Sequence, residues 1–467
     1  MARSKKTAIK SLSNAELLSY IINQDPILSE NLDLPVQGQS IIPIGKLIMG
    51  NKVYRNAFIN TINLIGVTII KRNVWDNPWE FTKRGTIAFG QHVREMINDL
   101  CNVYDYNAPS NDEARFLTNV VPNVLNYIHE INFQKFYETT TSDSQLAMAF
   151  TSEDGLYELI ADTIGMLYES LKYDEWLVDK YMLCRRIVDG TVTVKSISTD
   201  GDPRYVVAAM KSATNRMTFR SPNYNPAGIR RANKFEDLIT IMDSDFEGVM
   251  STAVLATSYY RDEAELRTGL RLIDSFSESD EARLTELLGD AYTPFTDDEK
   301  AQLAYIPAVV ISREWFMDYD YLLDAESETK ATEFYNPTTL KNNHFLHKWG
   351  VKSTSPFEQA LVFVANETPS VTSVTVSPST GTVLQGQSLQ MSAEVVTSYF
   401  ANKAVTWSVV DSTTELPVEG VTIDANGLLK VGADVANDLE FTVTATSVYD
   451  SSISGTATIA TPVTPGA

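Results

Sequence analysis

The C-terminal segment constrains the fold of this chain most strongly, because short β-prone runs alternate there with turn signals. From Thr368 onward, runs rich in Val, Ile, Thr and Phe are separated by Gly, Pro, Ser and Asn. Several short strands at this spacing are typical of two packed sheets. We therefore expect a separate all-β sandwich over residues 367–467. The runs are Val371–Val376, Leu389–Val396, Ala404–Val410, Val421–Ile423, Gly427–Val431 and Phe441–Val448.

Four motifs along this segment resemble the bacterial immunoglobulin-like group 2 (BIG2) family. The resemblance implies an Ig-like sandwich but no particular function, because such modules serve as stalks, adhesins and decorations. The function must therefore be sought in the larger body that precedes it. The motifs are Val374-Thr-Val-Ser-Pro378, Gln385-Gly-Gln387, Val405-Thr-Trp407-Ser-Val409, and Gly427-Leu-Leu-Lys-Val431 with Phe441-Thr-Val-Thr-Ala445.

The chain carries a net negative charge, and its acidic and basic residues are unevenly distributed along the sequence. The 467 residues suffice for two or three domains, and their net charge is -22, from 60 acidic and 38 basic side chains. This balance disfavours contact with the phosphates of nucleic acid, whose binding depends on Lys and Arg. From Glu367 onward there are ten acidic residues, and the basic ones are Lys403 and Lys430. Such a module is either simply soluble or faces water on the outside of a large assembly.

Neither export nor a disulfide framework is indicated by the sequence. The two cysteines, Cys101 and Cys184, lie far apart. The basic N-terminus, Met1–Lys10, is not followed by the apolar segment of a signal peptide, and no apolar run reaches membrane-spanning length. We expect no signal peptide and no contact with a membrane. An adhesin would require export.

The body is expected to mix helices and strands. A short helix at Asn14–Asn23 precedes a stretch rich in Pro and Gly, so residues 1–50 are interpreted as an arm without a core. Apolar residues spaced by three and four from Leu156 to Ile187 predict one long helix. Further helices are expected at Tyr205–Arg216 and Asp280–Leu288, and strands at Leu238–Met242, Ala308–Ile311 and Ala360–Val364.

Residues 73–90 combine aromatic side chains, proline and glycine with charge. This pattern predicts a two-stranded excursion that turns near Lys83-Arg84-Gly85. A lone hairpin has almost no core. Its aromatic rings should therefore pack on another surface.

Candidate chemistry is sparse. The histidines His344 and His347 form an H-x-x-H without a nearby cysteine or acidic partner, which favours packing over metal binding. Neither a nucleophile elbow nor a regular phosphate-binding loop is present, although a pair of carboxylates cannot be judged by counting. We therefore expect no catalytic residue, no cofactor, no metal site and no enzymatic activity.

Motifs through the body resemble the major head proteins of phi29-like small podoviruses. The similarity runs in order through most of residues 50–460. The motifs are Asn77-Pro-Trp-Glu-Phe-Thr-Lys-Arg-Gly85, Glu130–Tyr137, Val309-Val-Ile-Ser-Arg-Glu-Trp315-Phe-Met-Asp-Tyr-Asp320, Asn336-Pro337, His347-Lys-Trp349 and Ala360-Leu-Val-Phe-Val364.

The resemblance implies an α+β, HK97-like capsid fold with a C-terminal all-β Ig-like sandwich. The implied division is an N-terminal arm (1–50), a capsid body (51–366) and the Ig-like domain (367–467). Within the body it implies an extended E-loop at about 70–105, a spine helix at about 155–187, an axial domain at about 200–320 and a peripheral return at 325–366.

Assembly is the function that this resemblance implies. Copies of the chain would form hexamers and pentamers of an icosahedral head shell around double-stranded DNA, with the Ig-like domain facing outward. Scaffolding and portal proteins would be partners, DNA would be touched non-specifically, and the protein would be made in the host cytoplasm and reside in the virion. The E-loop residues expected at the assembly interface are Trp75, Pro78, Trp79, Phe81, Lys83 and Arg84.

A host-surface or glycan-binding adhesin, or a phage fibre protein, is the alternative. An export signal would favour the adhesin, and the sequence indicates none. A phage fibre escapes that objection. Weak contact between the Ig-like domain and a host surface is also compatible with a capsid role.

Overall fold

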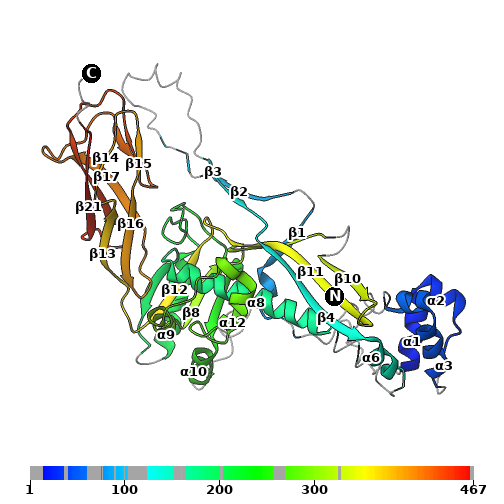
Figure 1. Cartoon of the computed structure of the whole chain (residues 1–467). Coiled ribbons are helices and arrows are strands. Elements are labelled where there is room, and N and C mark those ends of the chain that lie inside the picture. Colours follow the sequence, from blue (N-terminus) through cyan, green and yellow to red (C-terminus); the bar gives the residue numbers. More distant parts are fainter. Residues whose placement is uncertain are drawn as a thin grey trace, which may run out of the picture. The chain divides into compact units, whose positions relative to one another are not determined.

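The computed structural model divides into two compact units, whose helices and strands are labelled in Figure 1. Unit 1 contains residues 1–93, 129–178 and 318–352, and unit 2 contains residues 94–128, 179–317 and 353–467. No helix within the described part of the chain is long and apolar enough to cross a membrane. The structure describes residues 14–35, 40–59, 61, 75, 77–88, 91–98, 100, 101, 103, 124–151, 159, 163, 165–199, 203–255, 269–323 and 328–462.

Unit 1 is built on a five-stranded sheet. Its strand order is β1 (Lys83–Ile87), β9 (Phe316–Tyr321), β11 (Lys341–Thr354) and β10 (Thr329–Asn336), and β4 (Phe133–Ser142) also pairs with β11. β1 runs parallel to β9, with Lys83 opposite Asp318. The turn expected near Lys83-Arg84-Gly85 is therefore wrong, because these residues form a strand whose partner lies far along the chain.

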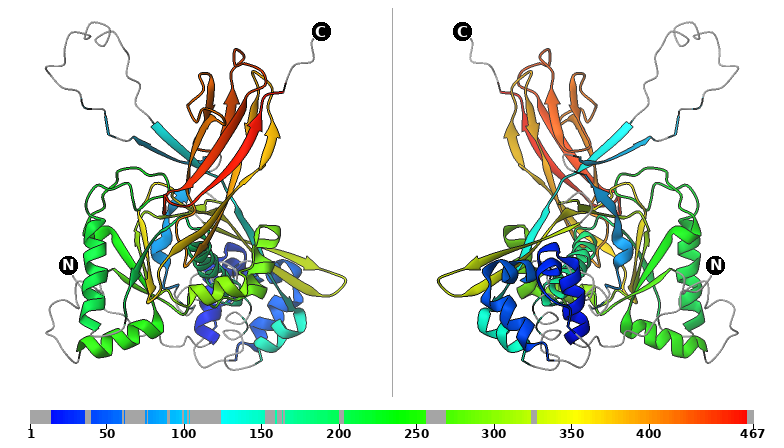
Figure 2. Two further views of the ribbon diagram at one scale, coloured as in Figure 1. Left: turned by 90° about the vertical axis from the view of Figure 1, so that its left-hand side faces the viewer. Right: turned by 90° about the vertical axis from the view of Figure 1, so that its right-hand side faces the viewer.

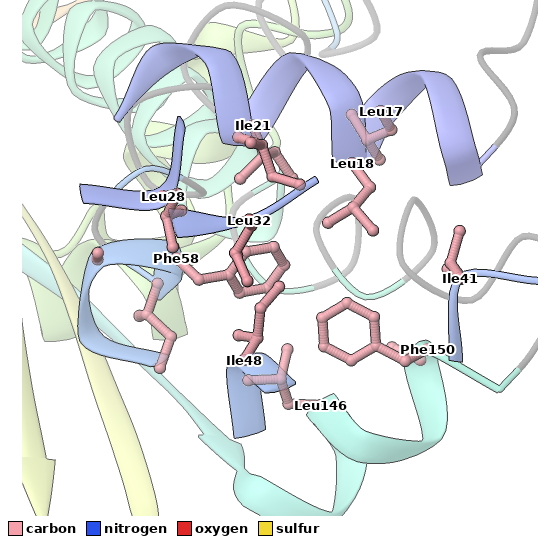
Figure 3. Close-up of a cluster of buried hydrophobic side chains, with 14 of the residues drawn as sticks. Leu17, Leu18, Ile21, Leu28, Leu32, Ile41, Ile48, Phe58, Leu146 and Phe150 are labelled. Carbon is pink, nitrogen blue, oxygen red and sulfur yellow. The ribbon is translucent and has the colours of Figure 1, made fainter. Parts of the chain in front are cut away.

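The N-terminal residues form a helical cluster with its own core. Helices α1 (Asn14–Gln24), α2 (Pro26–Asn31) and α3 (Ile42–Gly50) pack with α6 (Asp143–Ala149). Figure 3 shows their apolar side chains converging on the rings of Phe58 and Phe150, whose centroids lie 5.2 Å apart. The expectation of a coreless arm is wrong for the described residues. The sequence of the N-terminal residues does not predict this core, because part of the core comes from elsewhere in the chain. Leu146 lies on α6 and Phe150 directly follows it.

The long helix predicted from apolar spacing is confirmed where the structure describes it. α8 spans Met166–Val188, 23 residues, and its apolar side chains include Leu171, Leu177 and Leu183 among the buried ones. Of the residues predicted to lie in this helix, 155–158, 160–162 and 164 lie outside the described part of the chain. Asp174, Glu175 and Asp179 are also buried along α8.

Unit 2 contains a second five-stranded sheet. Its order is β5 (Thr193–Ile197), β12 (Ala360–Ala365), β8 (Ala308–Ser312), β6 (Leu238–Asp243) and β7 (Leu270–Ile273). All five residues of β8 are buried, as expected for a continuous apolar run inside a sheet. α9 (Pro203–Arg216) and α10 (Ser244–Leu255) pack against this sheet (Figure 2). The helices and strands predicted here are confirmed, including α12 (Glu281–Leu288), which α13 (Asp297–Leu303) follows.

The C-terminal residues form the predicted sandwich. The strands are β13 (Ser370–Ser377), β14 (Thr380–Thr382), β15 (Ser388–Gln390), β16 (Ser392–Ser398), β17 (Val405–Asp411), β18 (Val421–Ile423), β19 (Leu428–Val431), β20 (Glu440–Ser447) and β21 (Ser454–Ala460). Every second residue of β20 is buried, because alternate side chains of a strand point to opposite faces. Phe441, Val443 and Ile459 are fully buried in the core between the sheets.

Candidate assembly surfaces

Trp79, expected at an interface, lies inside its own subunit. Its side chain is 0% exposed, and its ring centroid lies 6.2 Å from that of Phe81. The backbone N–H of Trp79 donates to Asn77 Oδ1 (2.8 Å), and its carbonyl accepts from Thr82 Oγ1 (2.9 Å). The premise that this ring lacks a burial surface in its own chain is therefore wrong. The short 3-10 helix η1 (Glu80–Thr82) turns the chain so that the ring enters the core.

The other predicted interface residues differ in exposure. Trp75 is 41% exposed and its ring meets that of Trp176 edge to face, with the centroids 6.0 Å apart. Pro78 is exposed, whereas Phe81, Lys83 and Arg84 are half-buried. Trp75 and Pro78 thus offer surface to a partner, and Lys83 takes part in a contact within unit 1.

Lys83 belongs to a buried set of charges, the charged cluster. Its Nζ atom lies 2.9 Å from Glu175 Oε2 and 3.5 Å from Asp320 Oδ2. Lys348 Nζ lies 2.6 Å from Asp320 Oδ1 and 3.6 Å from Glu175 Oε1. The cluster joins β1, β9 and β11 to α8. Its members are Lys83, Glu175, Asp318, Asp320, Glu328, Lys348 and Lys352.

The pKa shifts in the charged cluster compare the effect of burial with that of the neighbouring charges. Burial raises the pKa of Asp318, although Lys352 Nζ lies 2.5 Å from its Oδ2 atom. Burial also opposes ionisation of Asp320, but Lys348 and Lys83 outweigh it and lower the pKa of that carboxyl. Burial disfavours charged Lys83, yet Glu175 and Asp320 raise its pKa. The cations therefore outweigh desolvation at Asp320, whereas burial outweighs Lys352 at Asp318. No sequence motif indicates the cluster, since its members come from separate elements.

A two-stranded pair carries exposed apolar side chains. β2 (Val93–Asn98) pairs with β3 (Val124–His129), and among the described residues neither strand joins a larger sheet. Met96 is 65% exposed and Ile128 is 50% exposed. Arg94 Nε donates to Asn126 Oδ1 across the pair (2.6 Å). β2 lies within the range of about 70–105 predicted for the E-loop, and its partner strand β3 lies beyond that range. The signal that could have located it is the run Val124–Ile128, which has little polar character.

One face of the unit 1 sheet carries aromatic rings. The rings of Phe136, Phe345 and His347 lie with centroids 6.0–6.4 Å apart on β4 and β11. Phe136 and Phe334 are among the exposed large apolar residues, as is Trp349. We call this set the aromatic face. Exposed apolar surface of this kind marks sites of interaction.

Of the H-x-x-H pair, His344 lies on the buried side of β11. Thr141 Oγ1 is 2.8 Å from its Nε2 atom, and burial lowers the pKa of His344 to about 4. His347 lies near Thr332, whose Oγ1 atom is 3.0 Å from its Nε2. Adjacent residues of a strand point to opposite faces, so the odd spacing of this pair separates the two rings. The pair is not a joint metal site.

Protonation of His344 should destabilise the fold in acid. The unfolded chain binds this proton at a pKa near 6.5, whereas the folded chain binds it only near 4. The free energy of unfolding should therefore fall by about 3 kcal/mol as the pH falls through this range. Urea denaturation at several pH values measures it. His344→Gln should remove this part of the pH dependence and His347→Gln should keep it; an unchanged dependence in His344→Gln would contradict the assignment.

Comparisons with known proteins agree along nearly the whole chain. A family model described as "Phi29-like phage major capsid protein" matches residues 34–364, and one described as "Bacterial Ig-like domain (group 2)" matches residues 370–453. The major capsid protein of Bacillus phage PZA is 28% identical over 407 residues, covering 86% of this chain and 83% of the relative. That of Bacillus phage GA-1 is 26% identical over 437 residues, covering 90% and 85%.

A solved structure of the Staphylococcus phage Andhra capsid is similar to part of the chain. The similarity covers 63% of this chain and 85% of that chain, with 12% sequence identity and a TM-score of 0.48.

Proposed function

The chain belongs to the family of Phi29-like phage major capsid proteins, and from that premise we propose that the β2–β3 pair is the E-loop joining neighbouring subunits. The protein is a major capsid protein and a component of the virion, with an HK97-like body and a C-terminal Ig-like domain. What remains to be assigned is which residues form the contacts of the shell.

The exposed apolar residues of the pair carry this proposal. An isolated two-stranded sheet is marginally stable in water. Met96, Val124 and Ile128 nevertheless expose apolar side chains on it. A neighbouring copy in a closed shell would provide the surface that buries them. Each contact can be modest, because a shell repeats it many times.

We place the receiving surface on the aromatic face of the neighbouring copy. Phe136, Phe334 and Trp349 are exposed there, and aromatic residues are enriched in interfaces. Trp75 and Pro78, which precede β2 in the sequence, are also exposed and are proposed to extend the same contact. Trp79, Phe81, Lys83 and Arg84 are proposed to support that contact from within their own subunit.

Charging the loop should block assembly without unfolding the subunit. The double variant Met96→Lys with Ile128→Lys is expected to remain folded and to form no closed shells, since two ammonium groups would have to be desolvated at each contact. Electron microscopy and sedimentation of the purified protein, alone and with a scaffolding protein, measure this.

A matched control lies in the Ig-like domain. Leu416 is 64% exposed, close to the 65% of Met96. Leu416→Lys should therefore add one ammonium group at nearly the exposure of Met96 and still yield shells. Closed shells from the Met96/Ile128 variant would contradict the E-loop assignment, and discrete oligomers from the unaltered protein under both conditions would contradict self-assembly of the purified chain.

The remaining organisation is proposed on the family resemblance. Residues 200–320 would form the axial domain, 325–366 the peripheral return, and residues 1–50 an N-terminal segment. Subunits would form hexamers and pentamers with scaffolding and portal partners. The acidic Ig-like domain would face outward, where a weak host-surface contact is compatible with its position, and packaged DNA would be touched only non-specifically.

We also propose that the protein acts by assembly and not by catalysis. The similarity to phage major capsid proteins supports this proposal. Catalytic turnover by purified shells, abolished by a point variant that still assembles, would contradict this proposal.

A further inference from the structure

We infer that the Ig-like domain is a clamp on the C-terminal end of α8, not an appendage on a flexible tether. The inference goes beyond the assembly role and rests on contacts within unit 2. The partner surface is the end of the helix, and the clamp is the segment Tyr399–Ala404 between β16 and β17.

The end of α8 is shaped to receive a cation. Gly190 adopts φ 68°, and its N–H donates to the carbonyl of Ile187 (3.0 Å). The N–H of Thr191 donates to the carbonyl of Arg186 (3.3 Å), which closes the helix in a Schellman-type turn. Carbonyls of the last turn point outward and carry partial negative charge.

Lys403 of the Ig-like domain binds at this end. Its Nζ atom donates to the carbonyl oxygen of Val188 at 2.9 Å. A cation at a helix C-terminus interacts favourably with the helix dipole. The module contains ten acidic residues and two lysines, and one of these lysines makes this contact. The positive charge of Lys403 therefore lies at the end of α8 that carries partial negative charge.

Gly190 and the loop that contains Ala401 and Lys403 lie in close contact. A Cβ atom on Gly190 would lie 2.9 Å from Lys403 Cγ and 3.0 Å from the carbonyl oxygen of Ala401. Glycine is thus required for two reasons, its left-handed backbone and the passing loop.

A second contact fixes the same loop. The N–H of Tyr399 donates to Gln302 Oε1 at 2.8 Å, and its ring meets that of Tyr305 edge to face, with centroids 5.6 Å apart. Tyr399 and Phe400 adopt φ values of 51° and 61°. Residues other than glycine hold this conformation only where their surroundings impose it. The loop is therefore held in one shape against the α13 region.

The linker between the capsid body and the Ig-like domain also forms hydrogen bonds with the body. Four residues, 366–369, separate β12 from β13. The N–H of Asn366 donates to the carbonyl of Ile197 (2.8 Å), and Asn366 Oδ1 accepts the N–H of Thr199 (2.7 Å). Ser196 Oγ donates to the carbonyl of Glu367 (2.6 Å). Contacts at the linker, at α13 and at α8 thus hold the module at three places.

The clamp couples the module to the spine helix. α8 ends at Val188, whose carbonyl oxygen accepts the hydrogen bond from Lys403 Nζ. A displacement of the helix end would have to move the Ig-like domain with it or break these contacts. The domain is therefore a mechanical part of the subunit.

Hydrogen exchange of the full-length protein tests the clamp. In Lys403→Met, exchange of the backbone amides of residues 185–191 should accelerate about tenfold, because a charged hydrogen bond at the helix end is lost. Lys430→Met is the matched control, since Lys430 is the other lysine of the module and lies exposed on β19. It should leave these amides unchanged. Equal exchange in Lys403→Met, Lys430→Met and the unaltered protein would overturn the inference.

A second variant tests the clamp independently, in case Lys403→Met does not fold. Gln302→Ala with Tyr305→Ala removes the α13 contact without altering the module. It should accelerate exchange in residues 399–401 and, through the loosened loop, in residues 185–191. Acceleration confined to residues 399–401 would mean that the loop docks without clamping the helix, and would also overturn the inference.

Discussion

Trp79→Ala is expected to lower the free energy of unfolding by about 3–5 kcal/mol. The ring is 0% exposed, so its removal forfeits apolar burial and leaves a cavity that the neighbouring β1 and η1 backbone cannot fill. Urea denaturation of the subunit, followed by fluorescence and circular dichroism, measures the loss.

Trp75→Ala is the control for this substitution. Trp75 is the same residue type in the same segment but is 41% exposed. Its truncation should cost far less, about 1 kcal/mol, most of it from the lost edge-to-face contact with Trp176. Equal stability of Trp79→Ala and the unaltered protein would place the ring of Trp79 outside the core and return it to the predicted assembly interface.

Lys348→Met should be comparably destabilising, by about 3–5 kcal/mol. Lys348 is 2% exposed and lies within ion-pair distance of Asp320, Glu175 and Glu328. Removing it leaves buried carboxylates with less compensating charge, which costs more than the ion pair contributes when intact. The same denaturation experiment measures this loss.

An exposed pair of the same type gives the matched comparison. Lys234 Nζ lies 3.7 Å from Glu236 Oε1, and both side chains are about three-quarters exposed, at 77% and 76%. Lys234→Met should change the free energy of unfolding by less than about 1 kcal/mol. A similar small effect for Lys348→Met would show that the charged cluster contributes little to the fold.

Elements whose residues alternate or repeat locally were predictable. The run Ala308–Ile311 predicts a buried strand and β8 is one, and the spacing of three and four residues predicts the helix observed as α8. The sandwich followed from short strands between turn residues. In each case the local pattern and the observed burial agree, because the same periodicity generates both.

The candidate surfaces were less predictable. Residues Lys83–Gly85 carry turn signals but form β1, since β9 offers a parallel partner that no local pattern specifies. The aromatic pattern around Trp79 predicts an exposed ring, whereas the ring is 0% exposed within its own subunit. The predicted E-loop range of about 70–105 includes β2 but not β3, because no local pattern specifies that the two strands pair.

The sequence by itself determined the family, the α+β body, the Ig-like domain and the long helix, because each depends on motifs or periodicities within short stretches. Only the tertiary structure decided which aromatic rings are buried, which charges share the cluster and how Lys403 meets the end of α8. The physical reason is that these contacts join residues far apart in the chain. The distances between these residues depend on how the helices and strands pack, and the local sequence around each residue does not specify that packing.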